Sequence, residues 1–451
     1  MASTRAPTTE PGAPPEHAPE HARDHPAGWY RWYVLGLLTL VSLFSVADRL
    51  VFSILTQDIK AEFDLSDAEV GLIGGLAFSI IYVIAGFPAA RLADRSVRKN
   101  IIGAAISFWS VMTAICGLAT GFWTLFLARV GVGVGEGCSG PASQSLVADF
   151  FRPAELARAM GILTMGATMG TAFGLMAGGL LSEAFGWRMA FVLMGLPGIA
   201  IGAIVVLSVR EPQRGRYAPK GARVAQLPLA QTLSTLLANR VYLGFAAGFA
   251  VQIMIGYAMA FWVAPAAIRQ FGVSTGDVAL LLGIAYLAGG LPGPVLGGFV
   301  TERLTRRDER WRAWFPGLVS LVCIAPLWWA FQMRDFAAFL ALFACAYGLF
   351  VASQAGILSG IQNAVEPSQR GFAVAIALCF NNILGQAVGL YLIGWISDGL
   401  APQYGVESLG MAVVGVCAVA GVAALALFGW TAAQMAPSGY LAKIKADQNP
   451  G

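Results

Sequence analysis

Long apolar runs separated by short polar segments dominate the sequence. Twelve such runs can be counted, each about 20 residues long. A helix of that length spans about 30 Å, which matches the hydrocarbon core of a bilayer. Lipid offers no hydrogen-bond partner to the backbone, so we expect helices. The pattern therefore predicts an all-α membrane protein with twelve transmembrane helices.

The predicted helices of the first half run over Val34–Leu55, Val70–Ala90, Ile101–Ala119, Trp123–Ala148, Ala157–Leu181 and Met189–Val209. Those of the second half run over Val241–Ile268, Val278–Val300, Phe315–Phe331, Phe336–Ile361, Phe372–Ile396 and Leu409–Trp430. The segment between the first two runs carries several acidic residues, including Glu62 and Asp67, and is interpreted as a solvated loop.

Basic residues are distributed unevenly over the predicted loops. The loops on one side contain only Lys60, Arg188, Arg269 and Arg334, and two further arginines lie within helices. The rest of the 29 lysines and arginines fall in the tails and in the loops of the other side. Because cytoplasmic loops are enriched in basic residues, we predict a multi-pass protein of the bacterial inner membrane with both termini in the cytoplasm.

The longest connection divides the chain into two halves. We predict a disordered cytoplasmic tail at 1–28, a six-helix bundle at 29–209, a cytoplasmic linker at 210–240, a second six-helix bundle at 241–433 and a cytoplasmic tail at 434–451. A repeated motif supports the division. It reads Asp94-Arg95-x-x-Arg98-Lys99 after the second helix of the first half and Glu302-Arg303-x-x-Arg306-Arg307 after the second helix of the second half. Two linked six-helix repeats with pseudo-two-fold symmetry resemble the major facilitator fold.

The charged residues of this repeated motif lie at tight turns between helices. Clustered acids and bases there can cap helix ends and form ion pairs across the interface between the halves. We therefore predict a gating role for these residues: Asp94, Arg95, Arg98, Lys99, Glu302 and Arg303. The alternative is that they set the membrane topology and have no gating role.

Composition argues against most enzyme chemistry. The three histidines, His17, His21 and His25, all lie in the N-terminal tail, and the six cysteines form no CxxC pair. A net charge of +4 gives no argument for nucleic-acid binding. We therefore expect no enzyme, no metal site, no cofactor and no nucleic-acid partner, and we expect a monomer surrounded by membrane lipids.

Four charged residues fall inside the apolar runs: Asp48 and Arg49 in the first helix, and Arg129 and Glu136 in the fourth. An ionised group at this depth needs a partner, a water-filled cavity or a proton. We predict that Asp48 forms an ion pair with Arg129, that Asp48 is the principal proton carrier, and that Glu136 is a coupled second site. A static ion-pair network is the alternative.

The second half offers neutral polar and aromatic side chains in place of charges. We predict that a substrate cavity is lined by Gln252, Tyr257, Phe380, Asn381, Asn382 and Gln386. Packing and hydrogen bonding between helices is the alternative for each of them.

Glycines recur every four residues in the fifth helix, at Gly166, Gly170, Gly174 and Gly178. Small residues on one helix face permit a close approach of a second helix. The run resembles an antiporter motif of the same superfamily, and close packing without an antiport role is the alternative.

The most specific resemblance lies in the first half. Asp48-Arg49, the stretch from Phe126 to Gly137, the segment Ala148-Asp149-Phe150-Phe151 and the segment from Glu211 to Gly215 together resemble the Spinster family of lipid transporters. The second half resembles only the wider superfamily.

The Spinster resemblance and the charged residues together indicate a substrate and a mode of transport. The resemblance implies an amphiphilic lysolipid- or sphingolipid-like substrate. The embedded carboxylates and the two-fold repeat add the prediction of a proton-coupled secondary transporter, an antiporter with alternating access. A proton-coupled organic-anion or drug transporter of the same superfamily is the alternative, and a membrane enzyme or channel is a third possibility.

Overall fold

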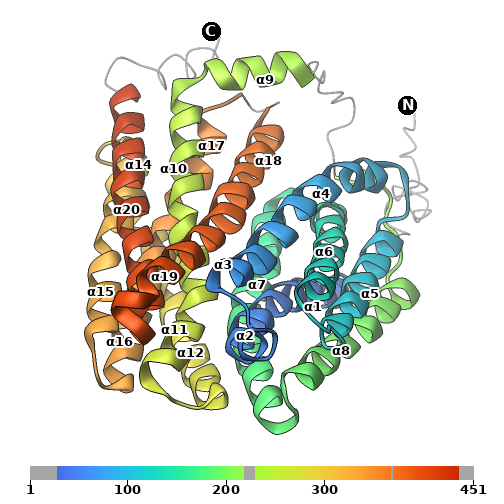
Figure 1. Cartoon of the computed structure of the whole chain (residues 1–451). Coiled ribbons are helices and arrows are strands. Elements are labelled where there is room, and N and C mark those ends of the chain that lie inside the picture. The colour runs from blue at the N-terminus through green and yellow to red at the C-terminus, as the bar shows by residue number, and fades with distance from the viewer. Residues whose placement is uncertain (1–27, 218–228, 367–368, 436–451) are drawn as a thin grey trace, which may run out of the picture.

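The computed structural model describes residues 28–217, 229–366 and 369–435 of the chain (Figure 1). The predicted tails lie outside the described residues, apart from Gly28, Gln434 and Met435, and so does the 218–228 part of the predicted linker. Every regular element in the described ranges is a helix.

The first half is built from α1 (Gly28–Ile54), α2 (Thr56–Phe63), α3 (Asp67–Gly71), the π-helical turn η2 (Leu72–Leu76), α4 (Ala77–Arg95), α5 (Arg98–Cys116), α6 (Phe122–Phe150), α7 (Pro153–Phe185) and α8 (Trp187–Ser208). Helices start or end several residues beyond the apolar runs, because polar residues at the ends continue the backbone hydrogen bonding. The predicted loop between the first two runs contains α2, and the side chain of Ser66 caps α3.

The second half begins with α9 (Leu229–Ala238), α10 (Arg240–Tyr257), η3 (Ala258–Trp262), α11 (Val263–Phe271), α12 (Thr275–Gly290), α13 (Pro292–Thr305), α14 (Trp311–Val322) and α15 (Ile324–Gln332). It continues with α16 (Phe336–Ser353), α17 (Ile357–Asn363), α18 (Arg370–Phe380), η5 (Asn381–Val388), α19 (Gly389–Tyr404) and α20 (Ser408–Gln434). Two short 3₁₀ turns, Gln354–Gly356 and Gly405–Glu407, complete the described elements.

Ten helical stretches of the described residues are long and apolar enough to cross a membrane. One of them, Arg370–Gln434, covers 65 residues and reverses between α19 and α20, where Gly405 has a φ of +53°. The charged helix α6 is not among the ten, but its 29 residues lie between α4 and α5 in the same bundle. The arrangement is consistent with the twelve predicted crossings.

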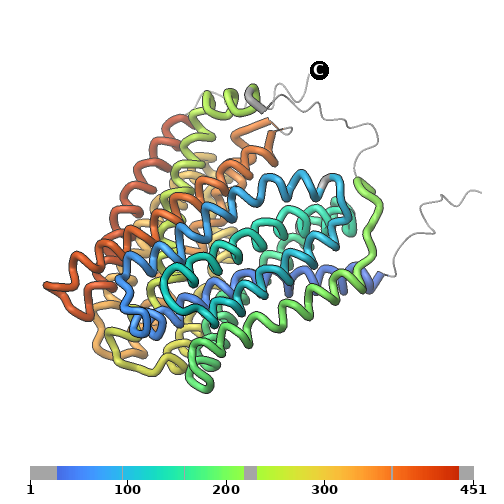
Figure 2. Tube along the Cα trace, turned by 45° about the vertical axis from the view of Figure 1, so that its right-hand side comes forward, coloured from blue at the N-terminus to red at the C-terminus, as the bar shows by residue number. Residues whose placement is uncertain are grey.

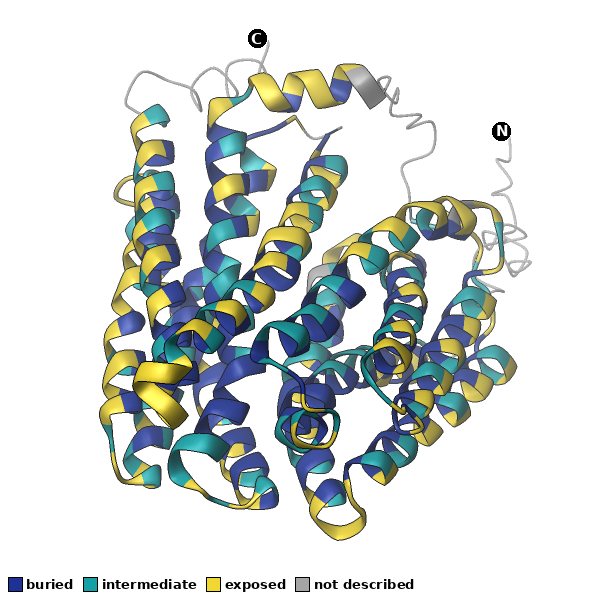
Figure 3. Cartoon of the chain, in the orientation of Figure 1, coloured by how far each residue is buried: buried dark blue, intermediate teal, exposed yellow. Residues whose placement is uncertain are grey.

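The helices form two bundles that lie side by side. In both views the helices from α1 to α8 group together, and those from α10 to α20 form the other group (Figures 1 and 2). The two bundles meet where α7 packs along α12, where α3 packs on α19 and where α4 packs on η5. Figure 3 shows buried and exposed residues alternating along the helices of both bundles. We name the two ends of the molecule the termini end, where α1 begins and α20 ends, and the α2 end.

The glycines of α7 bring α1 and α7 into close contact. A Cβ added at Gly174 would lie 2.6 Å from the Cα of Ala47, and one added at Gly178 would lie 3.2 Å from the Cα of Val51. The close approach predicted from the four-residue spacing is therefore present in the structure. It also places Asp48, the neighbour of Ala47, deep within the first bundle.

Candidate functional site

A buried ion pair joins α1 to α6 inside the first bundle. The guanidinium of Arg49 donates from Nε and Nη2 to Oε2 of Glu136, at 2.9 and 2.6 Å. Ser45, one turn before Arg49 on α1, donates to the same oxygen at 2.8 Å. The Glu136 side chain is fully buried, whereas 18% of the Arg49 side chain is exposed. Arg49 is therefore the partner that reaches accessible space.

Asp48 lies beside this pair but has a different partner. Its Oδ2 accepts a hydrogen bond of 3.0 Å from Thr113 of α5, and its Oδ1 has no protein partner. The predicted ion pair between Asp48 and Arg129 is wrong for this structure, because neither residue occurs in an ion pair of the described residues. Consecutive helical residues point about 100° apart. Arg49 therefore faces Glu136 while Asp48 faces Thr113.

Arg129 is held by aromatic rings instead of a carboxylate. It is 1% exposed, and its Nε and Nη1 atoms have no hydrogen-bond partner. Its guanidinium lies 5.0 Å from the ring centre of Phe52 and 5.4 Å from that of Phe78. Arg49 approaches the same Phe78 ring at 4.5 Å. Such cation–π contacts stabilise a desolvated guanidinium without neutralising its charge.

The glycine run of α6 explains why these groups come so close together. A Cβ added at Gly133 would lie 2.6 Å from the carbonyl oxygen of Phe78, and one added at Gly135 would lie 2.7 Å from Cβ of Trp109. These glycines therefore let α4 and α5 approach α6 on two sides. The run packs helices together, in agreement with its mid-helix position.

The polar residues of the second half separate into two groups. Tyr257 donates to Oδ1 of Asn382 at 3.3 Å and interacts electrostatically with Arg49 and Glu136, so it faces the charged cluster from the other bundle. Gln252, Asn381 and Gln386 are buried, and Gln252 donates to Ser353. Asn381 and Gln386 belong to η5, which packs against α4 and η2 of the first half.

The Phe380 side chain is 50% exposed at the end of α18. Of the six residues predicted to line a cavity, the structure therefore brings Tyr257 closest to the charged cluster, together with its hydrogen-bond partner Asn382.

A second charged network ties the two halves together at the α2 end. Asp67, at the start of α3, is 2% exposed and binds Lys60 at 2.6 Å. Arg269 of α11 in the other half donates to both carboxylate oxygens of Asp67, the longer bond being 2.7 Å. Ser397 of α19 adds a third hydrogen bond, also at 2.7 Å.

The backbone of α3 is fastened to the second half as well. The carboxylate of Asp398 accepts from the N–H groups of Asp67 and Ala68, at 2.9 and 2.8 Å, and so caps the helix. The interpretation of the acidic segment as a solvated loop is therefore wrong for Asp67, which sequence reasoning missed as a functional candidate. No local pattern marks it out, since its partners lie 202 and 330 residues away.

The predicted gating residues at the termini end form ties within the first half. Arg98 is 2% exposed and donates to Asp149 at 2.6 Å and to Glu211 at 2.7 Å. The Lys99 ammonium donates to the carbonyl of Val206 at 2.9 Å. Arg98 thus fastens the end of α6 and the segment after α8 to the start of α5.

Three of the remaining predicted gating residues, Glu302, Arg95 and Arg303, form no described ion pair between the halves. Glu302 pairs with Arg306 one turn further on the same helix at 2.6 Å, and Arg95 and Arg303 are exposed. The side chain of Asp94 lies outside what the structure describes. Within the described ranges, the ion pairs at the termini end each stay inside one half. The predicted pairing across the interface is therefore not formed by the gating residues whose side chains the structure describes, in contrast with the α2 end.

The described residues contain no cluster of three or more His, Cys, Asp or Glu side chains that could hold a metal ion. The chemistry that this arrangement offers consists of proton exchange at buried carboxylates and recognition of an anion by guanidinium groups.

Comparisons with known proteins agree with this architecture. A family model described as Major Facilitator Superfamily matches residues 37–390. An MFS-type efflux pump of Mycolicibacterium smegmatis is 32% identical over 383 residues, which cover 85% of this chain and 88% of that protein. The sphingosine-1-phosphate transporter SPNS2 of Danio rerio is 26% identical over 396 residues, which cover 83% of this chain and 77% of that protein.

A solved structure extends the comparison to three dimensions. The crystal structure of a bacterial homolog to the human lysosomal transporter Spinster, in an inward-facing and unoccupied conformation, superposes with a TM-score of 0.77 at 28% identity. The superposition covers 90% of this chain and 96% of that one. The chain therefore belongs to the Major Facilitator Superfamily, in which it is a Spinster-like, multi-pass membrane transporter and not an enzyme.

Proposed function

We propose that this transporter is a proton-coupled antiporter that moves a lysolipid- or sphingolipid-like amphiphile by alternating access. The buried cluster of Asp48, Arg49 and Glu136 carries the proposal. One oxygen of each carboxylate, Oδ1 of Asp48 and Oε1 of Glu136, has no protein partner. A buried carboxylate with an unpaired oxygen can gain or lose a proton. Because the ionised form is costly in free energy away from water, the change in protonation can drive the helices to rearrange.

The two ends of the molecule support alternating access. Asp67, Arg269 and Ser397 tie the halves at the α2 end, whereas the described ion pairs of the termini end stay within one half. With both termini in the cytoplasm, as the distribution of basic residues predicts, this conformation is open to the cytoplasm. The resemblance to the inward-facing Spinster homolog supports the same assignment.

In the proposed cycle, Asp48 is the principal proton carrier and Glu136 the coupled second site. An anionic headgroup competes with Glu136 for Arg49, the member of the cluster with exposed surface. Arg129 has two N–H groups without partners and is available as a second ligand for the headgroup or for a carboxylate. Protonation of Asp48 removes a negative charge beside both guanidiniums, so it couples proton binding to the affinity of the arginines for the anionic headgroup.

An amphiphilic substrate suits the surfaces around this cluster. Exposed apolar side chains lie on α4, where Ile84 is 58% and Phe87 is 56% exposed, and on α18, where Phe380 is 50% exposed. These elements contact each other through η5, so one apolar tail could lie against both halves while its headgroup binds the arginines. The relative in Danio rerio, named for sphingosine-1-phosphate, supports a phosphorylated amphiphile.

A second candidate is proton-coupled efflux of drugs or small organic anions. The 32% identity to the efflux pump of Mycolicibacterium smegmatis favours it. The two candidates use the same proton site and differ in the substrate.

Reconstituted proteoliposomes test the proposed function. A pH gradient is imposed, and the movement of a lysophospholipid, a sphingosine phosphate, a small carboxylate and a cationic dye is measured in parallel. We expect gradient-driven movement of one of the two lipids in the wild type and its loss in Asp48→Asn. Asp48→Glu, which keeps a titratable group, is the matched control and should retain part of the response.

Unchanged gradient-driven transport in Asp48→Asn would remove Asp48 from the coupling mechanism. Movement of the dye or the carboxylate with no movement of either lipid would favour the efflux function instead.

A further inference from the structure

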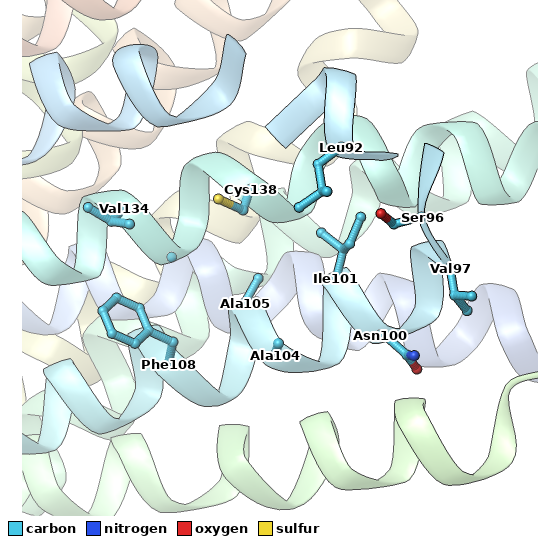
Figure 4. A pocket seen from close by; sticks show the side chains of 11 residues that line it. Leu92, Ser96, Val97, Asn100, Ile101, Ala104, Ala105, Phe108, Val134 and Cys138 are labelled. Carbon is cyan, nitrogen blue, oxygen red and sulfur yellow. The ribbon is translucent and has the colours of Figure 1, made fainter. Parts of the chain in front are cut away.

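An apolar groove runs along the outer side of the first bundle, away from the second half (Figure 4). It has a volume of about 730 Å³ and lies over α5, between the end of α4 and the middle of α6. Leu92, Ala104, Phe108 and Val134 are among its lining residues. Among the described elements, α5 packs against α6, α8 and α1 and against no helix of the other half with more than marginal contact. The groove therefore opens toward the membrane and not toward the space between the halves.

The length of the groove corresponds to one leaflet. Its lining along α5 extends from Val97 to Phe108, and eleven residues of helix rise about 16 Å. Half of the hydrocarbon core of a bilayer is about 15 Å thick. Polar lining is confined to the termini end, where Ser96 and Asn100 lie (Figure 4). The groove thus has the polarity and the length of a single acyl chain with its headgroup at the termini end.

Basic side chains gather at this polar end. Arg214, in the segment after α8, donates to the carbonyl oxygen of Ser96, which lines the groove. Arg95 is exposed and lies one turn beyond Leu92 on α4. The nearby acids Asp149 and Glu211 are both bonded to Arg98. The mouth of the groove therefore presents cations where a lipid headgroup would lie.

A matching groove occurs at the equivalent place in the second bundle. It has a volume of about 460 Å³ and is lined by α13, α14 and α16, including Val300, Phe315 and Cys345. These helices hold the same order in their half as α4, α5 and α6 hold in theirs. The exposed Arg303 and Arg306 lie at the end of α13, as Arg95 does at the end of α4. The repeated basic segments therefore each accompany an apolar groove.

We propose that the groove over α5 is a binding site for a membrane phospholipid with an anionic headgroup, drawn from the leaflet on the termini side. One acyl chain lies along Phe108 and Ala104, and the headgroup binds at Arg95 and Arg214. Juxtamembrane arginines and lysines attract anionic lipids, and each contributes roughly fivefold to the affinity. This site is separate from the transported substrate, which the buried cluster binds in the proposed function.

Native mass spectrometry of the full-length protein in detergent tests this site. Phosphatidylglycerol and phosphatidylcholine with identical acyl chains are added in equal amounts, and the retained lipid is identified by mass. We expect phosphatidylglycerol to be retained in preference. Ala104→Trp, at an exposed position inside the groove, should reduce the retained phosphatidylglycerol at least fivefold. Val111→Trp, one heptad further along the same face of α5 and outside the groove, is the matched control and should have no effect.

A second variant separates the headgroup from the acyl chain. Arg95→Gln should lower the preference for phosphatidylglycerol roughly fivefold without reducing the retention of phosphatidylcholine. Equal retention of the two lipids by the wild type would overturn the anionic site. Unchanged retention in Ala104→Trp, or an equal loss in Val111→Trp, would overturn the groove as its location.

Discussion

Glu136 accepts both hydrogen bonds of Arg49 on one carboxylate oxygen. Oε2 receives Nε at 2.9 Å, Nη2 at 2.6 Å and the hydroxyl of Ser45 at 2.8 Å, whereas Oε1 has no protein partner. Together with Ser45, Arg49 links α1 to α6 directly, and its partly exposed guanidinium balances the buried charge of Glu136. It also leaves a lone oxygen on which a proton or a new donor can bind.

Breaking this pair from one side should be more damaging than removing both charges. Arg49→Leu leaves a buried carboxylate without its cation, and such a loss costs about 3–5 kcal/mol of stability. Because 18% of the Arg49 side chain is exposed, we expect the lower end of that range. Arg49→Leu combined with Glu136→Gln should recover part of the loss. Thermal unfolding in detergent measures the wild type and both variants, and a double variant less stable than Arg49→Leu would contradict the pairing.

Asp67→Asn should weaken the closure of the α2 end. The change removes the charge that holds Lys60 and Arg269, and hydrogen bonds to charged groups contribute about 2 kcal/mol each. Loss of one such bond changes the ratio of closed to open molecules roughly 30-fold. Spin labels at the exposed positions Leu118 and Val406, one in each half, report the separation in a background whose native cysteines have been replaced.

Glu62→Gln is the control for this experiment. Glu62 also forms an ion pair at the α2 end, but its partner Arg188 belongs to the same half. The label separation should therefore match that of the parent protein. An unchanged separation in Asp67→Asn would show that other contacts hold the end closed.

Gly174→Val should separate α1 from α7. The added side chain would meet the backbone of Ala47, which cannot move aside as a flexible side chain can. Overpacking of this kind typically costs about 1–3 kcal/mol. We expect a lower Tm and reduced transport, because Asp48 follows Ala47 in α1. Gly161→Val on the same helix is the control, since a Cβ at Gly161 meets nothing within 4 Å.

Glu62 should make a stabilising contribution that acid removes. Hydrogen bonds from Arg188 and Trp187 lower the pKa of Glu62 below its ordinary value of about 4.3. A carboxylate with a lowered pKa stabilises the fold above that ordinary value, and the stabilisation is lost as the pH falls through the lowered pKa. The difference in Tm between the wild type and Glu62→Gln should therefore be present at pH 7 and shrink in acid. A difference that grows on acidification would contradict this sign.

Features that depend on residues close together in the sequence could be predicted from the sequence alone. The apolar runs predict the helices because lipid leaves the backbone no other way to satisfy its hydrogen bonds. The four-residue spacing of Gly166 to Gly178 predicts a close helix contact, which α1 supplies. The burial of Asp48, Arg129 and Glu136 also follows from their places within apolar runs.

Which charges meet could not be predicted in the same way. Asp48 and Arg49 are adjacent in the chain, yet only Arg49 reaches Glu136, while Arg129 lies on the rings of Phe52 and Phe78. That outcome depends on how far α1 and α6 are rotated and shifted against each other. Gly133 and Gly135 set how closely α6 approaches α4 and α5, and the glycines of α7 set the position of α1.

The tie between Asp67 and Arg269 illustrates the same limit over a longer distance. The sequence pattern predicts whether a side chain is buried in the membrane, because its depth follows from its position along its own helix. The identity of its partner depends on the distance and rotation between helices that the chain separates by up to hundreds of residues. Only the packing of the helices within and between the two bundles decides those quantities, and with them the Arg49–Glu136 pair and the ties at the α2 end.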